Sequence, residues 1–124
     1  MDAPLFLSST TLVGDPVVNR EGDKLGELVD IMLDTSGSGR IAYGVIGSGG
    51  ILGMGKKLFA VPWSAVAVDT DNKALVVDVD KDTLDAAPGF DPDHWPQPGD
   101  GVWAQMYRHY GFDPYWEDPA PPLT

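Results

Sequence analysis

Apolar and polar residues alternate in short runs between turn signals over the first eighty residues, which is the pattern of β-strands. The run LGELVDIML at 25–33 has one nearly apolar side and one mixed side, which suits a sheet buried on one face. Further strands are predicted at 41–47 and 74–80, with turns at 19–24 and 34–40 that are rich in Gly, Asp, Asn and Ser. The side of the 25–33 strand predicted to face the core holds Leu25, Glu27, Val29, Ile31 and Leu33.

The segment KLFAVPWSAVAVD at 57–69 is strand-like on both sides of Pro62. Proline cannot donate to a sheet ladder, so a straight central strand cannot pass through it. A bend at Pro62 would let the chain turn the corner of a barrel. With turns every 8–12 residues or so, the pattern is that of a small all-β sandwich or barrel.

The pattern changes after Asp80. One helical turn is expected around 81–87, with Asp82 as its N-cap and Pro88 as its stop, followed by a proline-rich connector. A short helix is predicted near 100–110, and Gly111 would close it. Between Trp95 and Trp116 the chain holds seven of its 12 aromatic residues. The apolar stripe of this helix is Val102, Trp103, Met106, Tyr107 and Tyr110.

Composition narrows the class of protein. The chain has 124 residues, 43% of them apolar, which is enough for one core. Its net charge of −11 argues against direct nucleic-acid binding, because such proteins need clustered cations. No cysteine is present, which excludes disulfides and thiolate chemistry. The first residues do not resemble a signal peptide, and no apolar run approaches the length of a membrane span. A soluble, cytoplasmic protein is expected.

The glycine-rich segment GILGMGKK at 50–57 matches the G-x-x-x-x-G-K spacing of a phosphate-binding loop. That loop needs Ser or Thr after its lysine and a helix behind it, but Lys57 and a strand-like segment follow here. The glycines are therefore interpreted as conformational, in a loop between strands. Three apolar residues between them, Ile51, Leu52 and Met54, are candidates for a contact surface.

Other chemical signals are weak. Asp78, Asp80 and Asp82 alternate, but Thr83 and Gly89 stand where a calcium-binding EF-hand loop needs glycine and glutamate. The two histidines, His94 and His109, belong to no metal-binding motif, and no serine lies in a nucleophile elbow. The sequence therefore predicts no catalytic residues, no metal site and no cofactor, and the chain is not expected to be an enzyme.

Four stretches together resemble the PRC-barrel family: G-D-x-L-G-x-L-x-D at 22–30, GGILGMGKK at 49–57, VPWSAV at 61–66 and LDAAPGF at 84–90. The resemblance covers about residues 9–90 and implies a closed barrel of about six strands that acts in assembly through protein contacts. Residues 91–124 would form a proline- and aromatic-rich extension. The family includes the H subunit of photosynthetic reaction centres and a ribosome maturation factor. The membrane helix of the former and the N-terminal domain of the latter are not found here, so neither role is carried over.

The leading hypothesis is a non-catalytic interaction or assembly module that self-associates. Its candidate contact residues in the tail are Trp103, Tyr107, Tyr110, Tyr115 and Trp116. These aromatics could close one end of their own barrel or form a homodimer or partner surface, since aromatic clusters serve both cores and interfaces. The alternative is a protein that binds a small ligand or a divalent metal. A ribosome-associated assembly factor is the third hypothesis, by family analogy alone.

Overall fold

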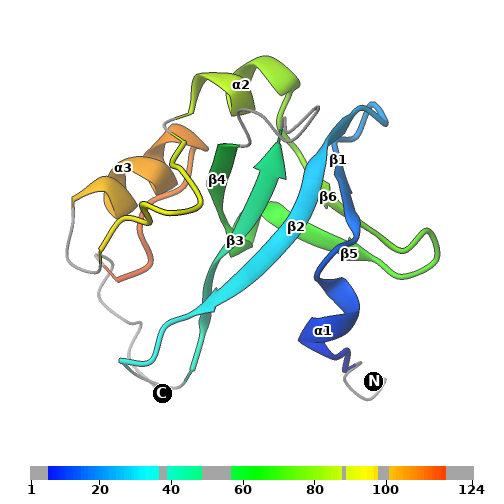
Figure 1. Cartoon of the computed structure of the whole chain (residues 1–124), viewed down its shortest axis with the longest axis horizontal. Coiled ribbons are helices and arrows are strands. Elements are labelled where there is room, and N and C mark those ends of the chain that lie inside the picture. The colour runs from blue at the N-terminus through cyan, green and yellow to red at the C-terminus, as the bar shows by residue number, and fades with distance from the viewer. Residues whose placement is uncertain (1–5, 37–38, 49–56, 88, 98–100, 117–124) are drawn as a thin grey trace, which may run out of the picture.

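A computed structural model describes residues 6–36, 39–48, 57–87, 89–97 and 101–116 (Figure 1). The fold is mostly β, with six strands in one sheet and short helices around it. None of the helices in these ranges is long and apolar enough to cross a membrane. The elements are α1 (Ser9–Leu12), β1 (Pro16–Val18), β2 (Lys24–Leu33), β3 (Ile41–Ser48), β4 (Lys57–Pro62), the 3₁₀ turn η2 (Trp63–Ala65), β5 (Val66–Asp69), β6 (Ala74–Val77), α2 (Lys81–Ala86) and α3 (Val102–His109).

The strands lie in the order β4-β3-β2-β1-β6-β5. All neighbouring pairs are antiparallel except β1 and β6, which are parallel, with Val17 opposite Leu75. The predicted number of strands is confirmed. Strands β4 and β5 form the two ends of the sheet, and no pairing between them joins these ends within the described ranges. The closure of the barrel therefore stays a prediction.

Pro62 ends β4, as the sequence predicts. It is buried and lies opposite Tyr43 of β3 in the ladder. The 3₁₀ turn follows at once, and the backbone N–H of Val66 donates to the carbonyl of Trp63 as β5 begins. Because proline removes a ladder donor and fixes φ, the chain leaves the β4 edge here and resumes at the opposite end of the sheet.

The predicted alternation along β2 is wrong in its details. Leu25 and Leu28, three residues apart, are both buried, whereas Leu33 is 60% exposed. The register of β2 against β3 shifts between Leu28 and Asp30, as expected for a bulge. A bulge inserts an extra residue and moves the following side chains to the other face of the sheet, so strict two-residue spacing fails along this strand.

Gly26 allows β2 and β3 to approach each other closely. A Cβ atom at this position would lie 2.3 Å from the carbonyl oxygen of Gly47 and 2.8 Å from Cγ2 of Ile46. Both distances are far inside van der Waals contact. The glycine in the G-D-x-L-G motif therefore has a steric cause, because no other residue fits without moving the β3 backbone.

The two C-terminal helices differ in how well the sequence locates their ends. Helix α2 has Asp80, and not Asp82, as its N-cap: the Asp80 carboxylate accepts from the backbone N–H of Thr83 at 2.6 Å. Asp80 has the extended backbone that an N-cap needs. Helix α3 ends as predicted, because Gly111 has φ of +86° and its N–H donates to Arg108.

The core lies between the sheet and the helices, and α3 contributes to it directly. Helix α3 packs against β4, and Figure 1 shows it beside that end of the sheet. The extension after residue 90 is thus joined to the sheet by a shared core. The buried residues of this core are Leu12, Val17, Leu25, Leu28, Ile46, Phe59, Ala60, Val61, Leu75, Val77, Leu84, Ala87, Met106, Tyr107 and Tyr110.

We expect Gly26→Ala to lower the free energy of unfolding by about 1–3 kcal/mol, the usual cost of overpacking. The new methyl group would force the backbone of β3 away from β2. Urea unfolding followed by tryptophan fluorescence measures the change.

Gly101→Ala is the matched control, because a Cβ there meets nothing within 4 Å and the backbone is already right-handed helical. It should change stability by about 1 kcal/mol or less. Equal effects of the two substitutions would contradict the steric role of Gly26.

Candidate functional site

Two aromatic residues of α3 attach the C-terminal tail to the sheet. The Tyr107 side chain is 2% exposed, and its hydroxyl donates to the backbone carbonyl of Ala42 in β3. The Trp103 ring stacks on Tyr43, with centroids 4.6 Å apart. Burial raises the pKa of Tyr107 to about 12, so its hydroxyl stays protonated and remains a donor at neutral pH. Helix α3 is thus held by both stacking and a backbone hydrogen bond.

A second attachment lies where the chain passes from β2 to β3. The Tyr115 hydroxyl donates to the carboxylate of Asp34, and the Arg40 guanidinium lies 4.3 Å from the centroid of the Tyr115 ring. Hydrogen bonds from the Ser36 side chain and from Tyr115, with smaller contributions from the Ser36 backbone and Arg40, hold the pKa of Asp34 at about 2. Burial and the nearby Asp34 charge raise the pKa of Tyr115. The two hydrogen-bonded groups therefore keep opposite protonation states over a wide pH range.

The remaining tail aromatics differ in exposure. Trp116 is 47% exposed, although its ring meets the edge of Tyr107 at a centroid distance of 5.2 Å. Tyr110 is only 9% exposed, and its hydroxyl is buried with no hydrogen-bond partner in the described part of the chain. Desolvation raises its pKa, so the hydroxyl is a neutral donor. An unsatisfied buried hydroxyl is costly and calls for an explanation.

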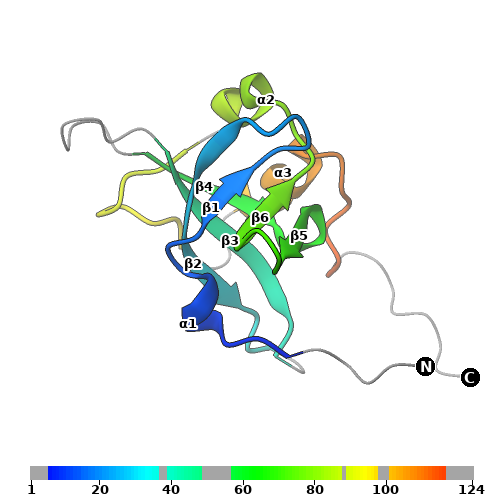
Figure 2. The ribbon, with the colours of Figure 1, turned by 90° about the vertical axis from the view of Figure 1, so that its right-hand side faces the viewer.

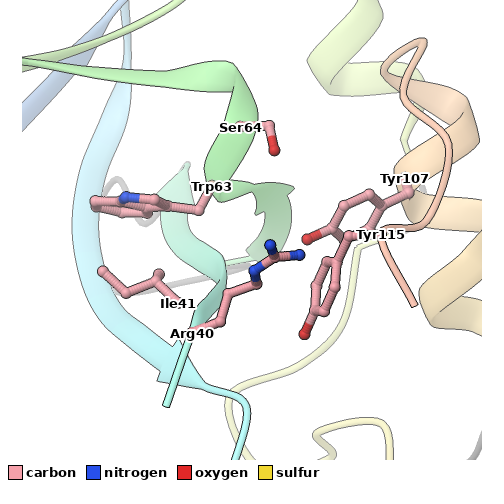
Figure 3. A pocket seen from close by; sticks show the side chains of 6 residues that line it. All are labelled: Arg40, Ile41, Trp63, Ser64, Tyr107 and Tyr115. Atoms are coloured by element: carbon pink, nitrogen blue, oxygen red, sulfur yellow. The ribbon is translucent and has the colours of Figure 1, made fainter. Parts of the chain in front are cut away.

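The turn Trp63–Ala65, which follows Pro62, is called the sheet corner below. A hollow of about 370 Å³ lies between this corner and the tail (Figure 3). In Figure 3 the Arg40 side chain extends toward Tyr107 and Tyr115, and the Ser64 hydroxyl faces the space between them. The hollow thus has a cation, a hydroxyl and aromatic walls. Its lining residues are Arg40, Ile41, Trp63, Ser64, Tyr107 and Tyr115.

A second hollow of about 590 Å³ begins on the other side of Ser64, which lines both. Its walls come from β5, β6 and the start of the tail after α3. At its rim Arg20 and Asp78 form an exposed ion pair at 3.5 Å. Both hollows thus lie between the sheet corner and the tail. The lining residues are Arg20, Ser64, Ala65, Val66, Ala67, Val76, Asp78, Val79, Tyr110 and Phe112.

The structure brings together some of the candidate residues and leaves others undescribed. Trp103, Tyr107, Tyr110 and Tyr115 all pack in or against the core, which is the self-packing arrangement considered for the tail. The glycine-loop candidates Ile51, Leu52 and Met54 lie outside the described residues. Among the residues that the structure does describe, no three His, Asp or Glu side chains gather closely enough to hold a metal ion.

Sequence reasoning missed several residues at this site: Asp34, Arg40, Trp63 and Ser64. Two of them had a signal, because Trp63 and Ser64 directly follow Pro62, where a bend was predicted. Asp34 and Arg40 flank a turn, and nothing in their spacing indicates that Tyr115, some eighty positions later, will contact both.

Comparison with known proteins gives the family. No curated protein matches the chain. Among solved structures, the chain is similar to a protein assigned to 16S ribosomal RNA processing, RimM, from Pseudomonas aeruginosa. The two are 18% identical with a TM-score of 0.44, and the match covers 61% of this chain and 45% of RimM, less than half of its length.

The family model of the PRC-barrel domain matches residues 5–84, which is more than half of the chain. This stretch includes all six strands and the corner after Pro62. The chain belongs to the PRC-barrel domain family.

Proposed function

We propose that this chain is a non-catalytic protein-interaction module whose contact surface combines the sheet corner with the aromatic tail. The observation that supports the proposal most is the pair of hollows that meet at Ser64, one lined by Trp63, Tyr107, Tyr115 and Arg40. Tyr, Trp and Arg are the residues most enriched at the centres of protein interfaces. In this proposal the tail forms one wall of the binding surface, and the partner contacts the groove between the tail and the sheet.

The charge of the chain indicates the kind of partner. At −11, two copies repel each other, whereas a basic partner is attracted. We therefore assign the surface to a partner protein of opposite charge. Self-association, barrel closure and a cytoplasmic location are further predictions from the sequence. A measured mass that doubles with concentration would favour the homodimer instead.

A second candidate function is the binding of a small anionic ligand in the hollow beside Arg40. This hollow offers a guanidinium, the Ser64 hydroxyl and aromatic walls, which together suit a carboxylate or phosphate joined to a flat group. The ribosome-associated role rests on family analogy alone, because the similarity to RimM is too remote to argue for it.

The small-ligand candidate predicts a rise in melting temperature with millimolar nucleotides, since a ligand that binds only the folded state stabilises it. Arg40→Gln should abolish that rise. Calcium and magnesium test the metal alternative in the same assay. Unchanged melting in every case would remove this second function.

Docking of the tail should depend on pH through Asp34. Its pKa is about 2 in the folded chain against an ordinary value of 3.8, so its stabilising contribution is present above about pH 4 and is lost as the pH falls toward about 2. We expect Asp34→Asn to lower the melting temperature at neutral pH, and the difference from the wild type to vanish near pH 2. Thermal unfolding across this range, followed by near-UV circular dichroism, measures it.

Glu21→Gln is the control, because Glu21 is an exposed carboxylate in the turn after β1. Tyr115→Phe removes the hydrogen bond to Asp34 from the other side and leaves the bonds from Ser36, so it should reproduce part of the effect of Asp34→Asn. The contact does not hold the tail if the melting temperature of Asp34→Asn depends on pH as that of Glu21→Gln does, and if Tyr115→Phe leaves the melting temperature unchanged.

The proposed interaction function predicts that filling the groove with a larger side chain weakens the binding of a partner protein. Ala67 is exposed on β5 and lines the larger hollow, so Ala67→Arg adds both bulk and repulsion toward a basic partner. In affinity capture from native extract, we expect a protein retained by the wild type to be reduced at least about tenfold by this variant, a loss typical of an interface centre.

Ala86→Arg, at the exposed end of α2, adds the same side chain away from the residues that line the hollows. It should retain the partner fully. Equal retention by Ala67→Arg and Ala86→Arg would contradict the proposed surface, and the absence of any retained protein would contradict the proposed function.

A further inference from the structure

The two ends of the sheet are not equivalent. The outer edge of β4 is partly covered, because Leu58 and Phe90 exchange two backbone hydrogen bonds of 2.9 Å. Strand β5 pairs with β6 on one side only, and no strand within the described ranges pairs with its other side. Figure 2 shows β5 at this end of the sheet, beyond β6. An exposed strand edge is a template for a further strand.

The hydrogen bonds around β5 show which of its backbone groups face outward. The N–H of Val66 donates to Trp63, and the carbonyl of Val77, its partner in the ladder, accepts from Val79 at 2.8 Å. Val66 and Val77 are therefore a pair without mutual hydrogen bonds. Such pairs alternate with bonded ones along an antiparallel ladder, so the N–H and C=O of Val68 point away from β6.

Side chains beside this edge provide a place for an apolar group. Val68 is 40% exposed. The larger hollow is lined by its neighbours Val66 and Ala67 and by Phe112 of the tail. Tyr110 lines the same hollow, while its hydroxyl is buried and has no hydrogen-bond partner among the described residues.

The charges around the edge are mostly negative. Asp69 ends β5, Asp71 and Lys73 follow in the turn to β6, and Asp113 directly follows Phe112. Among the described residues, Arg20 is the only cation that lines the larger hollow, and it is paired with Asp78. With a net charge of −11 behind them, these carboxylates favour a cationic occupant over a second copy of this chain.

We propose that an extended, lysine- or arginine-rich segment of a partner protein adds to the outer edge of β5 as a further strand. Its backbone bonds to the N–H and C=O of Val68, and one apolar side chain enters the larger hollow. This is recognition by strand addition, in which backbone bonds give affinity and the pocket gives side-chain selectivity. The proposal deepens the interaction function above and rests on it.

The test uses the full chain and a short fluorescein-labelled peptide that alternates lysine and valine, with binding followed by fluorescence anisotropy. The peptide is compared with a glutamate–valine version and with two versions N-methylated on alternate residues in opposite phase. Because only one phase directs its N–H groups toward β5, methylation of that phase should abolish binding and methylation of the other should not. The glutamate version should not bind.

Variants of the chain locate the contact. Val68→Pro removes a donor that β6 does not use, and Val68→Thr keeps that donor at the same β-branched position. We expect at least about a tenfold loss of peptide affinity for Val68→Pro and about twofold or less for Val68→Thr. If Val68→Pro unfolds, hydrogen exchange of the Val68 amide in the wild type decides the matter, because bound peptide should slow it.

Tyr110→Phe is a control at the hollow. It removes a buried hydroxyl that has no hydrogen-bond partner among the described residues, so the melting temperature should hold or rise. Peptide affinity should stay within about twofold of the wild type, because an aromatic side chain still lines the hollow. A loss as large as that of Val68→Pro would contradict the placement of the peptide at the β5 edge.

Four results would overturn the proposal. Equal binding of the lysine and glutamate peptides would refute the charge argument, and insensitivity to the phase of N-methylation would refute strand addition. Protection of the Val68 amide without peptide, together with a doubled mass, would place a second copy on the edge. A native partner that is lost with Ala67→Arg but kept with Val68→Pro would sink this inference while leaving the interaction function intact.

Discussion

The corner after Pro62 is the constraint on which the rest of the structure depends. Proline ends β4 because it cannot donate to the ladder, and the 3₁₀ turn sends the chain away from that edge. Strand β5 then pairs with β6 at the opposite end of the sheet. As a result, the two ends of the sheet are joined by a few residues that also lie between the two hollows, and Ser64 lines both.

The C-terminal tail packs beside this corner, and the two together line the hollows. Its aromatics are attached by contacts of different kinds: a buried hydroxyl on a strand carbonyl, a stacked tryptophan and a tyrosine held by a carboxylate and a guanidinium. Tyrosine suits this role, because its ring fills the core while its hydroxyl reaches a polar partner. Tyr110 breaks the pattern, because its buried hydroxyl has no hydrogen-bond partner among the described residues, and its side chain lines the larger hollow. The same tail therefore both completes the core and borders the groove.

Local sequence patterns predicted the elements well where one physical cause dominates. Turn residues and apolar runs located the strands, Pro62 located the corner and Gly111 located the end of α3. Predictions failed where contacts with a neighbouring strand or with a nearby backbone group decide the local structure. The bulge between Leu28 and Asp30 shifts the faces of β2, and the capping role goes to Asp80 because its carboxylate reaches Thr83. Neither depends on spacing along the chain alone.

The sequence by itself determined the family, the number of strands, the acidic charge and the aromatic character of the tail, because each is a property of short segments or of composition. Only the tertiary structure decided the strand order, and hence that no strand in the described ranges pairs with the outer side of β5. It also decided that Asp34 and Arg40 meet Tyr115, and that the Tyr110 hydroxyl has no partner among the described residues. These facts join segments far apart in the chain, and local propensity carries no information about such contacts.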